Sequence, residues 1–142
     1  MMESAKRALR VLVVDDLRDS TDILCVLLET LGHHVRGATS AADALAIAAE
    51  LHPHLVILDI GLPDLNGYDV ARELRRRAGS RRLHLAAVTG WGTTHDHVRA
   101  IAAGFDQHFL KPADERTIRQ ICDAAIRTIS TGTITIPEVR PS

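Results

Sequence analysis

Four short apolar runs constrain the fold of this chain most strongly, because each of them ends at a polar or charged residue. The runs and the residues that follow them are 11–14 before Asp15 and Asp16, 55–58 before Asp59, 85–88 before Thr89, and 109–110 before Lys111. Short aliphatic runs of this kind are typical of parallel strands that are buried on both faces of a sheet. The carboxyl ends of such strands form the ligand crevice of an open α/β sheet. We therefore expect the three acids, the threonine and the lysine to converge at one edge of the sheet.

Segments with a helical spacing of apolar residues separate these runs, so strands and helices alternate along the chain. Gly32 and Gly104 are expected to end two of the helices, and Thr39 or Ser40 to begin another. A weak, polar-flanked run around Val35 predicts a short strand at the edge of the sheet. Alternation of this kind predicts an α/β fold with a doubly wound, five-stranded parallel sheet that is covered by helices on both faces.

The chain of 142 residues is expected to form one domain, from residue 8 to residue 129, followed by a C-terminal tail or linker at 130–142. The formal net charge of −1 gives no general basic field, so direct binding of nucleic acid is not expected. A local basic stretch, made by Arg75 to Arg77 and by Arg81 and Arg82, is interpreted as a solvated helix end and loop.

Neither the cysteines nor the apolar segments point to secretion or to a membrane. Cys25 and Cys122 lie far apart on different expected helices, where free thiols act as small apolar side chains. The first apolar run is too short for the core of a signal peptide, and no run approaches the ~18 residues of a membrane span. A cytoplasmic protein without membrane insertion is therefore expected.

The acids expected at the crevice require a counter-charge. Each close pair among Asp15, Asp16 and Asp59 costs about 1–4 kcal/mol, so the cluster favours a bound cation. A ligand set made only of oxygen atoms favours Mg²⁺ or Mn²⁺, which also share a phosphate. Lys111 can pair first with a carboxylate and then with a phosphoryl oxygen, and Thr89 offers a hydroxyl donor. An aspartate held between a metal and a lysine can act as a nucleophile and become an aspartyl phosphate.

Taken together, the motifs at these positions resemble the receiver domain of two-component response regulators, over roughly residues 10–129. The motifs are Val-Val-Asp-Asp ending at Asp16, the stretch from Leu58 to Gly67, Thr89-Gly90, and Lys111-Pro112. The resemblance implies the flavodoxin-like (βα)5 receiver fold with the strand order 2-1-3-4-5. It also implies a signalling protein that catalyses only its own phosphorylation and slow dephosphorylation, and not an enzyme in the usual sense.

The same resemblance implies a role for each residue that handles the phosphoryl group. Asp59 would be the phosphoacceptor, Thr89 would sense the phosphoryl group, and Lys111 would neutralise it. Lys111 and Pro112 would be joined by a cis peptide bond, which is accessible before a proline and would aim the lysine into the crevice.

A metal ion would be held at the same place by the ligands that the resemblance implies, which are Asp15, Asp16, Asp59 and the backbone carbonyl of Gly61. Gly61 and Trp91 lie two residues past Asp59 and Thr89, respectively. In this family, side chains at such positions tune how fast the acyl phosphate is hydrolysed.

Phosphorylation would repack the last two helices and the strand between them, and so switch that face of the domain toward a partner. The family usually has an aromatic residue three positions before the lysine, and here that residue is His108. The stretch 104–112 is similar to receivers attached to hybrid histidine kinases, and a free-standing regulator is the alternative origin. The partner would be a histidine kinase or a histidine phosphotransfer protein, and the same face is a candidate for a homodimer.

Two other functions stay open at this point. Phosphatases of the haloacid dehalogenase type also use an Asp nucleophile, Mg²⁺, a Thr or Ser and a Lys, but they place a second acid two residues after the nucleophile. This chain has Gly61 there, which disfavours repeated turnover of phosphate esters. The other alternative is a degenerate receiver that serves only as a docking module, and the presence of all five crevice residues argues against it.

Overall fold

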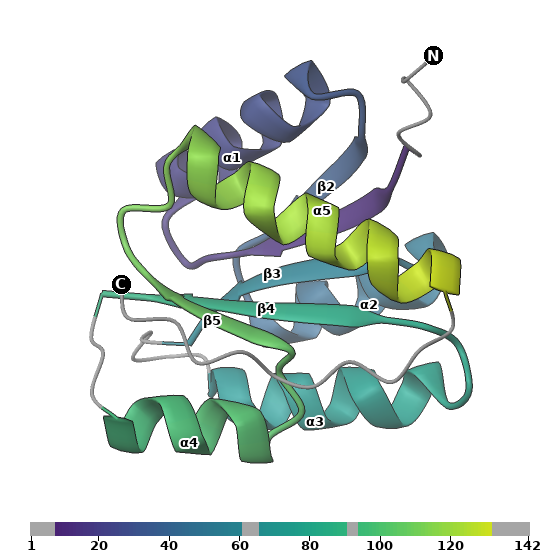
Figure 1. Cartoon of the computed structure of the whole chain (residues 1–142), viewed down its shortest axis with the longest axis vertical. Helices are drawn as coiled ribbons and strands as arrows, with labels where there is room; N and C mark the ends of the chain where they lie inside the picture. Colours follow the sequence, from purple (N-terminus) through teal and green to yellow (C-terminus); the bar gives the residue numbers. More distant parts are fainter. Residues whose placement is uncertain (1–7, 61–65, 91–93, 132–142) are drawn as a thin grey trace.

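Five parallel strands form one sheet in the order β2-β1-β3-β4-β5 (Figure 1). The computed structural model describes residues 8–60, 66–90 and 94–131, with 94–97 and 131 described by their backbone alone. The elements in chain order are β1 Arg10–Val14, α1 Arg18–Thr30, β2 His34–Ala38, α2 Ala41–Leu51, β3 Leu55–Asp59, α3 Gly67–Ala78, β4 His84–Thr89, α4 Thr94–Ala102, β5 Gln107–Leu110 and α5 Glu115–Thr131. The predicted α/β class and strand order are confirmed, and β2 lies at the edge as expected.

Helices cover both faces of the sheet, and Figure 1 shows α1 and α5 on one side of it and α3 and α4 on the other. Leu12 and Val14 belong to the core that contains residues of α2, α3 and α4. Val11 and Val13, which point to the opposite face, belong to the core that contains residues of α1 and α5. None of these four side chains is more than 1% exposed. Burial on both faces explains why the strand sequences are continuously apolar.

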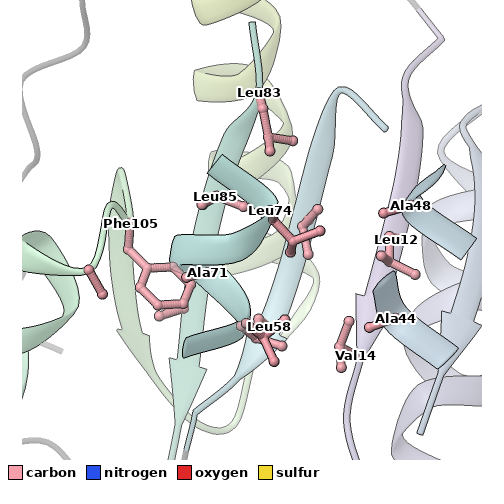
Figure 2. Packing of buried hydrophobic residues seen from close by; sticks show 14 of the residues in the cluster. Leu12, Val14, Ala44, Ala48, Leu58, Ala71, Leu74, Leu83, Leu85 and Phe105 are labelled. Atoms are coloured by element: carbon pink, nitrogen blue, oxygen red, sulfur yellow. The ribbon is translucent and has the colours of Figure 1, made fainter. Parts of the chain in front are cut away.

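The core on the α2–α3–α4 side combines strand residues with alanines from the helices. Figure 2 shows Ala44 and Ala48 of α2 facing Leu12 and Val14 of β1. These small side chains let the helix backbone approach the sheet closely. Phe105, which lies between α4 and β5, is 1% exposed and supplies the large aromatic ring of this core. Burial of such a ring contributes roughly 1.5–3 kcal/mol to the free energy of unfolding.

The helix ends follow the local signals in the sequence. The Ser40 side chain accepts a hydrogen bond from the backbone N–H of Asp43 at 3.1 Å, so Ser40 rather than Thr39 is the N-cap of α2. Gly32 and Gly104 have φ values of 98° and 104°, the left-handed conformation that glycine favours at the end of a helix. Both predicted helix ends are confirmed.

The last helix is longer than expected, since α5 continues through Thr131 and not only to residue 129. Ile129 is buried, and Arg82 Nη1 donates to its carbonyl oxygen at 2.9 Å, which satisfies one of the last carbonyl groups of the helix. The helical turn therefore extends into the segment that was expected to be tail. The remainder of that segment, 132–142, lies outside the described residues.

Neither Cys25 nor Cys122 forms a disulfide bond in the part of the chain that the structure describes. Within the described ranges, none of the helices combines the length and the apolar character needed to cross a bilayer.

Candidate functional site

The carboxyl ends of three neighbouring strands bring polar side chains together. Asp15 follows the last residue of β1, Asp59 ends β3, and Thr89 ends β4. Because β1, β3 and β4 are adjacent and parallel, these side chains lie at the same edge of the sheet. Their exposed fractions are only 2%, 5% and 2%, respectively. Two carboxylates and a hydroxyl are thus held at a largely buried end of the sheet, as the sequence predicts.

Lys111, which follows β5, places its ammonium group between the two buried acids. Its Nζ donates to Asp15 Oδ2 at 3.2 Å and makes a second, shorter hydrogen bond to Asp59 Oδ2. Burial opposes the charge of Lys111, but the hydrogen bond to Asp59 and the negative charges of Asp59 and Asp15 outweigh it and raise the pKa of the lysine. The ammonium therefore stays charged at neutral pH.

The backbone around Lys111 is fixed as well. The peptide bond between Lys111 and Pro112 is cis, as the resemblance to receiver domains implies. The backbone N–H of Lys111 donates to the carbonyl of Thr89 at 2.8 Å, which ties the segment after β5 to the end of β4. This hydrogen bond connects the lysine directly to the strand end that carries the threonine.

Asp15 is oriented by the start of α1. One of its carboxylate oxygens, Oδ1, accepts a hydrogen bond from the backbone N–H of Leu17 at 3.0 Å. Its other carboxylate oxygen faces Lys111, and its backbone carbonyl accepts a hydrogen bond from Thr21 Oγ1 at 3.1 Å. The turn between β1 and α1 is thereby shaped around this aspartate.

The expected cluster of three acids is only partly assembled. Asp15 and Asp59 meet at Lys111, whereas Asp16 is half-buried in the turn after β1. Among the side chains that the structure describes, those of residues 8–60, 66–90 and 98–130, no three His, Cys, Asp or Glu group tightly enough to hold a metal ion. The donor chemistry still fits a hard divalent cation, because three carboxylates and one ammonium give a formal local charge of about −2 and offer only oxygen ligands.

A cavity of about 410 Å³ opens beside these residues. Asp15, Asp59 and Lys111 line it together with apolar side chains of α1, including Ile23 and Leu24. Ile23 is 68% exposed, although it stands at helical spacing with the other apolar residues of α1. Helical spacing identifies the apolar face of α1, but it does not show which residues of that face line a cavity.

His108 is buried in β5, with 6% of its surface exposed. It pairs in register with Ala87 of β4, so it lies on the same face of the sheet as Ala87 and, two residues further, Thr89. That face is covered by α3 and α4. The remaining predicted positions, Gly61 and Trp91, lie outside the described residues.

One contact near this face had no signal in the sequence. The guanidinium carbon of Arg99 in α4 lies 4.4 Å from the ring centroid of Tyr68 in α3, a cation–π distance. The two residues are far apart in the chain, and their meeting depends on the two helices covering the same side of the sheet.

The sheet order and the helices on both faces are those of the CheY-like receiver fold, and the family match shows a signalling domain, not a classical enzyme. The sequence model described as response regulator receiver domain matches residues 11–123, so the chain belongs to this family. The family implies a histidine kinase as partner, and its members typically use Mg²⁺.

Comparisons with individual proteins agree with this family assignment. The chain is 32% identical over 117 residues to the protein PilH of Pseudomonas aeruginosa, covering 82% of this chain and 97% of that protein. It is 29% identical over 129 residues to the DNA-binding dual master transcriptional regulator RpaA of Synechocystis, covering 91% of this chain but only 52% of that protein. The fold is similar to that of a CheY-like receiver domain protein from Methanospirillum hungatei, with a TM-score of 0.81, 24% identity, and coverage of 89% of this chain and 100% of that one. The chain thus spans nearly all of one curated relative and about half of another.

Proposed function

We propose that Asp59 accepts a phosphoryl group from the phosphohistidine of a histidine kinase or of a histidine phosphotransfer protein. The observation that carries this proposal is the sharing of one ammonium group by two buried carboxylates, since Lys111 Nζ donates to both Asp15 and Asp59. The carboxylate of Asp59 can act as the nucleophile. The ammonium of Lys111 already lies beside it, where it can neutralise negative charge of the incoming phosphoryl group.

The transfer would require a divalent cation, Mg²⁺ or Mn²⁺, held by Asp15, Asp16, Asp59 and the backbone carbonyl of Gly61. The support is chemical, because the acids supply hard oxygen donors and Lys111 balances only one of their three charges. When bound, the ion neutralises the negative charge of the phosphoryl oxygens.

In the transfer step, a carboxylate oxygen of Asp59 forms a new bond to phosphorus while the phosphorus–nitrogen bond of the phosphohistidine breaks. The imidazole leaves with the electron pair of that bond and takes up a proton. The modified oxygen of Asp59 then carries no charge of its own, so Lys111 pairs with a phosphoryl oxygen instead. Before the transfer, the hydrogen bond to Asp59 and the charges of Asp59 and Asp15 raise the pKa of Lys111, so the ammonium is already charged when the phosphoryl group arrives.

The new group adds about −1.5 to −2 charge at neutral pH, and the hydroxyl of Thr89 is the donor placed to sense it. The hydrogen bond from the Lys111 N–H to the Thr89 carbonyl supports coupling of this strand end to the segment that enters α5. His108, on the same face as Thr89, would take the place of the usual aromatic residue, and Trp91 would modulate access. The α4–β5–α5 face would thereby switch toward a partner or a second copy.

Because Gly61 carries no acidic side chain, we expect hydrolysis of the aspartyl phosphate to be slow. Gly61 stands two residues after Asp59, where a phosphatase would carry a second acid to activate water. The chain would therefore lose the group slowly by its own hydrolysis and would not turn over phosphate esters.

Labelling with acetyl phosphate tests the proposal. With Mg²⁺ present, the wild-type protein should incorporate phosphate, as measured on a phosphate-affinity gel, and chelation of the metal should prevent it. Asp59→Asn should abolish labelling, whereas the control Asp123→Asn, at an exposed position of α5, should label as the wild type does. An unlabelled wild-type protein at saturating donor would overturn the proposal, as would many turnovers of a small phosphate ester.

A further inference from the structure

The edge of the sheet opposite to Asp59 holds a second cavity, of about 580 Å³. At this edge the strands begin and the helices α2, α3 and α5 end (Figure 1). Its lining contains no acid but six basic side chains, which are Arg10, His52, His54, Arg77, Arg81 and Arg82. Because the whole chain has a net charge of −1, this concentration of positive charge is a local feature.

Carbonyl groups at the helix ends hold two of these arginines in place. Arg10 Nε donates to the carbonyls of Leu51 and His52, at 2.9 and 3.0 Å, where α2 ends. Arg82 Nη1 donates to the carbonyl of Ile129 near the end of α5, at 2.9 Å. A guanidinium group has five N–H donors, so these bonds leave several donors for a ligand. The side chains are thus oriented before any ligand arrives.

The third such arginine, Arg81, is held at the end of α3. Its Nε donates to the carbonyl of Ala78 at 3.4 Å, and its Nη1 contacts Nδ1 of His52. The contact with His52 brings the ends of α2 and α3 together at the cavity. The basic stretch, which its sequence favoured as a solvated helix end and loop, therefore contributes Arg77, Arg81 and Arg82 to the lining of a cavity.

Three of the four arginines also lack an acidic partner within the described ranges. Arg77 pairs with Glu73 at 2.7 Å, whereas Arg10, Arg81 and Arg82 make no ion pair with a carboxylate of residues 8–60, 66–90 or 98–130. Each helix C-terminus offers a partial charge of only about −0.5, so the three helix ends balance about half of these three charges. A multiply charged anion would balance the rest.

The floor of the cavity is aliphatic, formed by Ala48, Leu74, Leu83 and Ile129. Its volume lies within the range of about 300–1,000 Å³ that is usual for small-molecule sites. Planar guanidinium groups bind phosphate groups through two parallel hydrogen bonds, and an aliphatic floor suits the face of a flat ring. We propose that this cavity binds a nucleoside polyphosphate, with its phosphates on Arg10, Arg81 and Arg82 and its base against the aliphatic floor.

Titration calorimetry of the full chain, without Mg²⁺ and at physiological salt, tests this proposal with ATP and GTP as probes. Dissociation constants in the micromolar range are expected, with tripolyphosphate weaker than either nucleotide and the bare nucleosides not binding. Ala49→Glu places a carboxylate on the lining while keeping every arginine, and it should weaken binding at least tenfold. Ala46→Glu, at an exposed position of the same helix that does not line the cavity, should bind as the wild type does.

Arg82→Gln should also weaken nucleotide binding, and Asp59→Asn should leave it unchanged, so the result is independent of the proposed phosphorylation. Circular dichroism on each variant separates loss of the site from loss of the fold. The proposal is overturned if neither nucleotide binds at millimolar concentration, if Ala49→Glu binds as tightly as Ala46→Glu, or if tripolyphosphate binds as tightly as the nucleotides.

Discussion

Lys111 Nζ lies 3.2 Å from Oδ2 of Asp15, although 96 residues separate the two in the sequence. This contact joins the end of the first strand to the segment after the last one. The same ammonium reaches Asp59 on the strand between them, so a single cation holds two buried acids in one place. The chemistry proposed for the protein depends on this arrangement.

Lys111→Met should lower the rate of phosphorylation by acetyl phosphate about tenfold or more, because the developing phosphoryl charge loses a preorganised cation. Initial rates of labelling at fixed Mg²⁺ provide the measurement. The side chain is 34% exposed, so the fold should persist, and circular dichroism checks this. Lys111→Arg keeps the charge and should retain more activity than Lys111→Met. Equal rates for the wild type and Lys111→Met would show that the ammonium has no part in the transfer.

Gly67→Ala should destabilise the protein by about 1–3 kcal/mol, because the first residue of α3 packs directly on the backbone after β3. A Cβ atom at Gly67 would lie 2.8 Å from the Cα atom and 2.6 Å from a side-chain carbon of Ile60. Gly90→Ala is the matched control, since a Cβ there meets nothing within 4 Å. Urea unfolding should give a clear loss for the first variant and little change for the second. Equal stability of the two variants would show that close packing of Gly67 on Ile60 does not limit the residue at this position.

His84 should make the protein less stable as the pH falls. The side chain is fully buried, and this burial lowers its pKa. The charges of Arg75 and Arg127 reinforce the effect, whereas the charge of Asp106 and the hydrogen bond that His84 Nε2 donates to Gln107 Oε1 partly oppose it. Below the unfolded-state pKa of about 6.5, the unfolded chain takes up a proton that the folded imidazole resists. The free energy of unfolding should therefore decrease on acidification below that pH, by up to about 1.4 kcal/mol per pH unit from this group.

Urea unfolding at pH 7.5 and at pH 5.5 measures this effect. The difference between the two pH values should shrink in His84→Gln, which removes the titrating group. It should persist in the control His34→Gln, at an exposed position of β2. An unchanged pH dependence in His84→Gln would assign the effect to other groups.

The carboxyl-edge residues could be placed from the sequence because their position follows from one rule. In a parallel sheet all strands end on the same side, so residues such as Asp15 and Asp59 must share an edge once their strands are identified. This rule predicts at which edge of the sheet the residues lie, but it does not predict which of their side chains contact one another. The half-buried position of Asp16 and the placement of Lys111 between the other two acids depend on the shape of the turns.

The opposite edge could not be predicted in the same way. Arg10 begins a strand and Arg82 precedes one, and their common cavity depends on where three helices end. Helix ends are set partly by tertiary contacts, as the bond between Arg82 and the Ile129 carbonyl shows for the turn that extends α5 beyond its expected end. Sequence patterns carry little information about such contacts.

The role of Asp59 as phosphoacceptor can be examined by identifying the modified residue itself. The wild-type protein, labelled with acetyl phosphate and Mg²⁺, is reduced with borohydride, which converts an aspartyl phosphate to homoserine, and the peptides are then sequenced by mass spectrometry. We expect homoserine at Asp59 and at no other aspartate. Homoserine at Asp15 or Asp16, or labelling without any homoserine, would contradict this expectation.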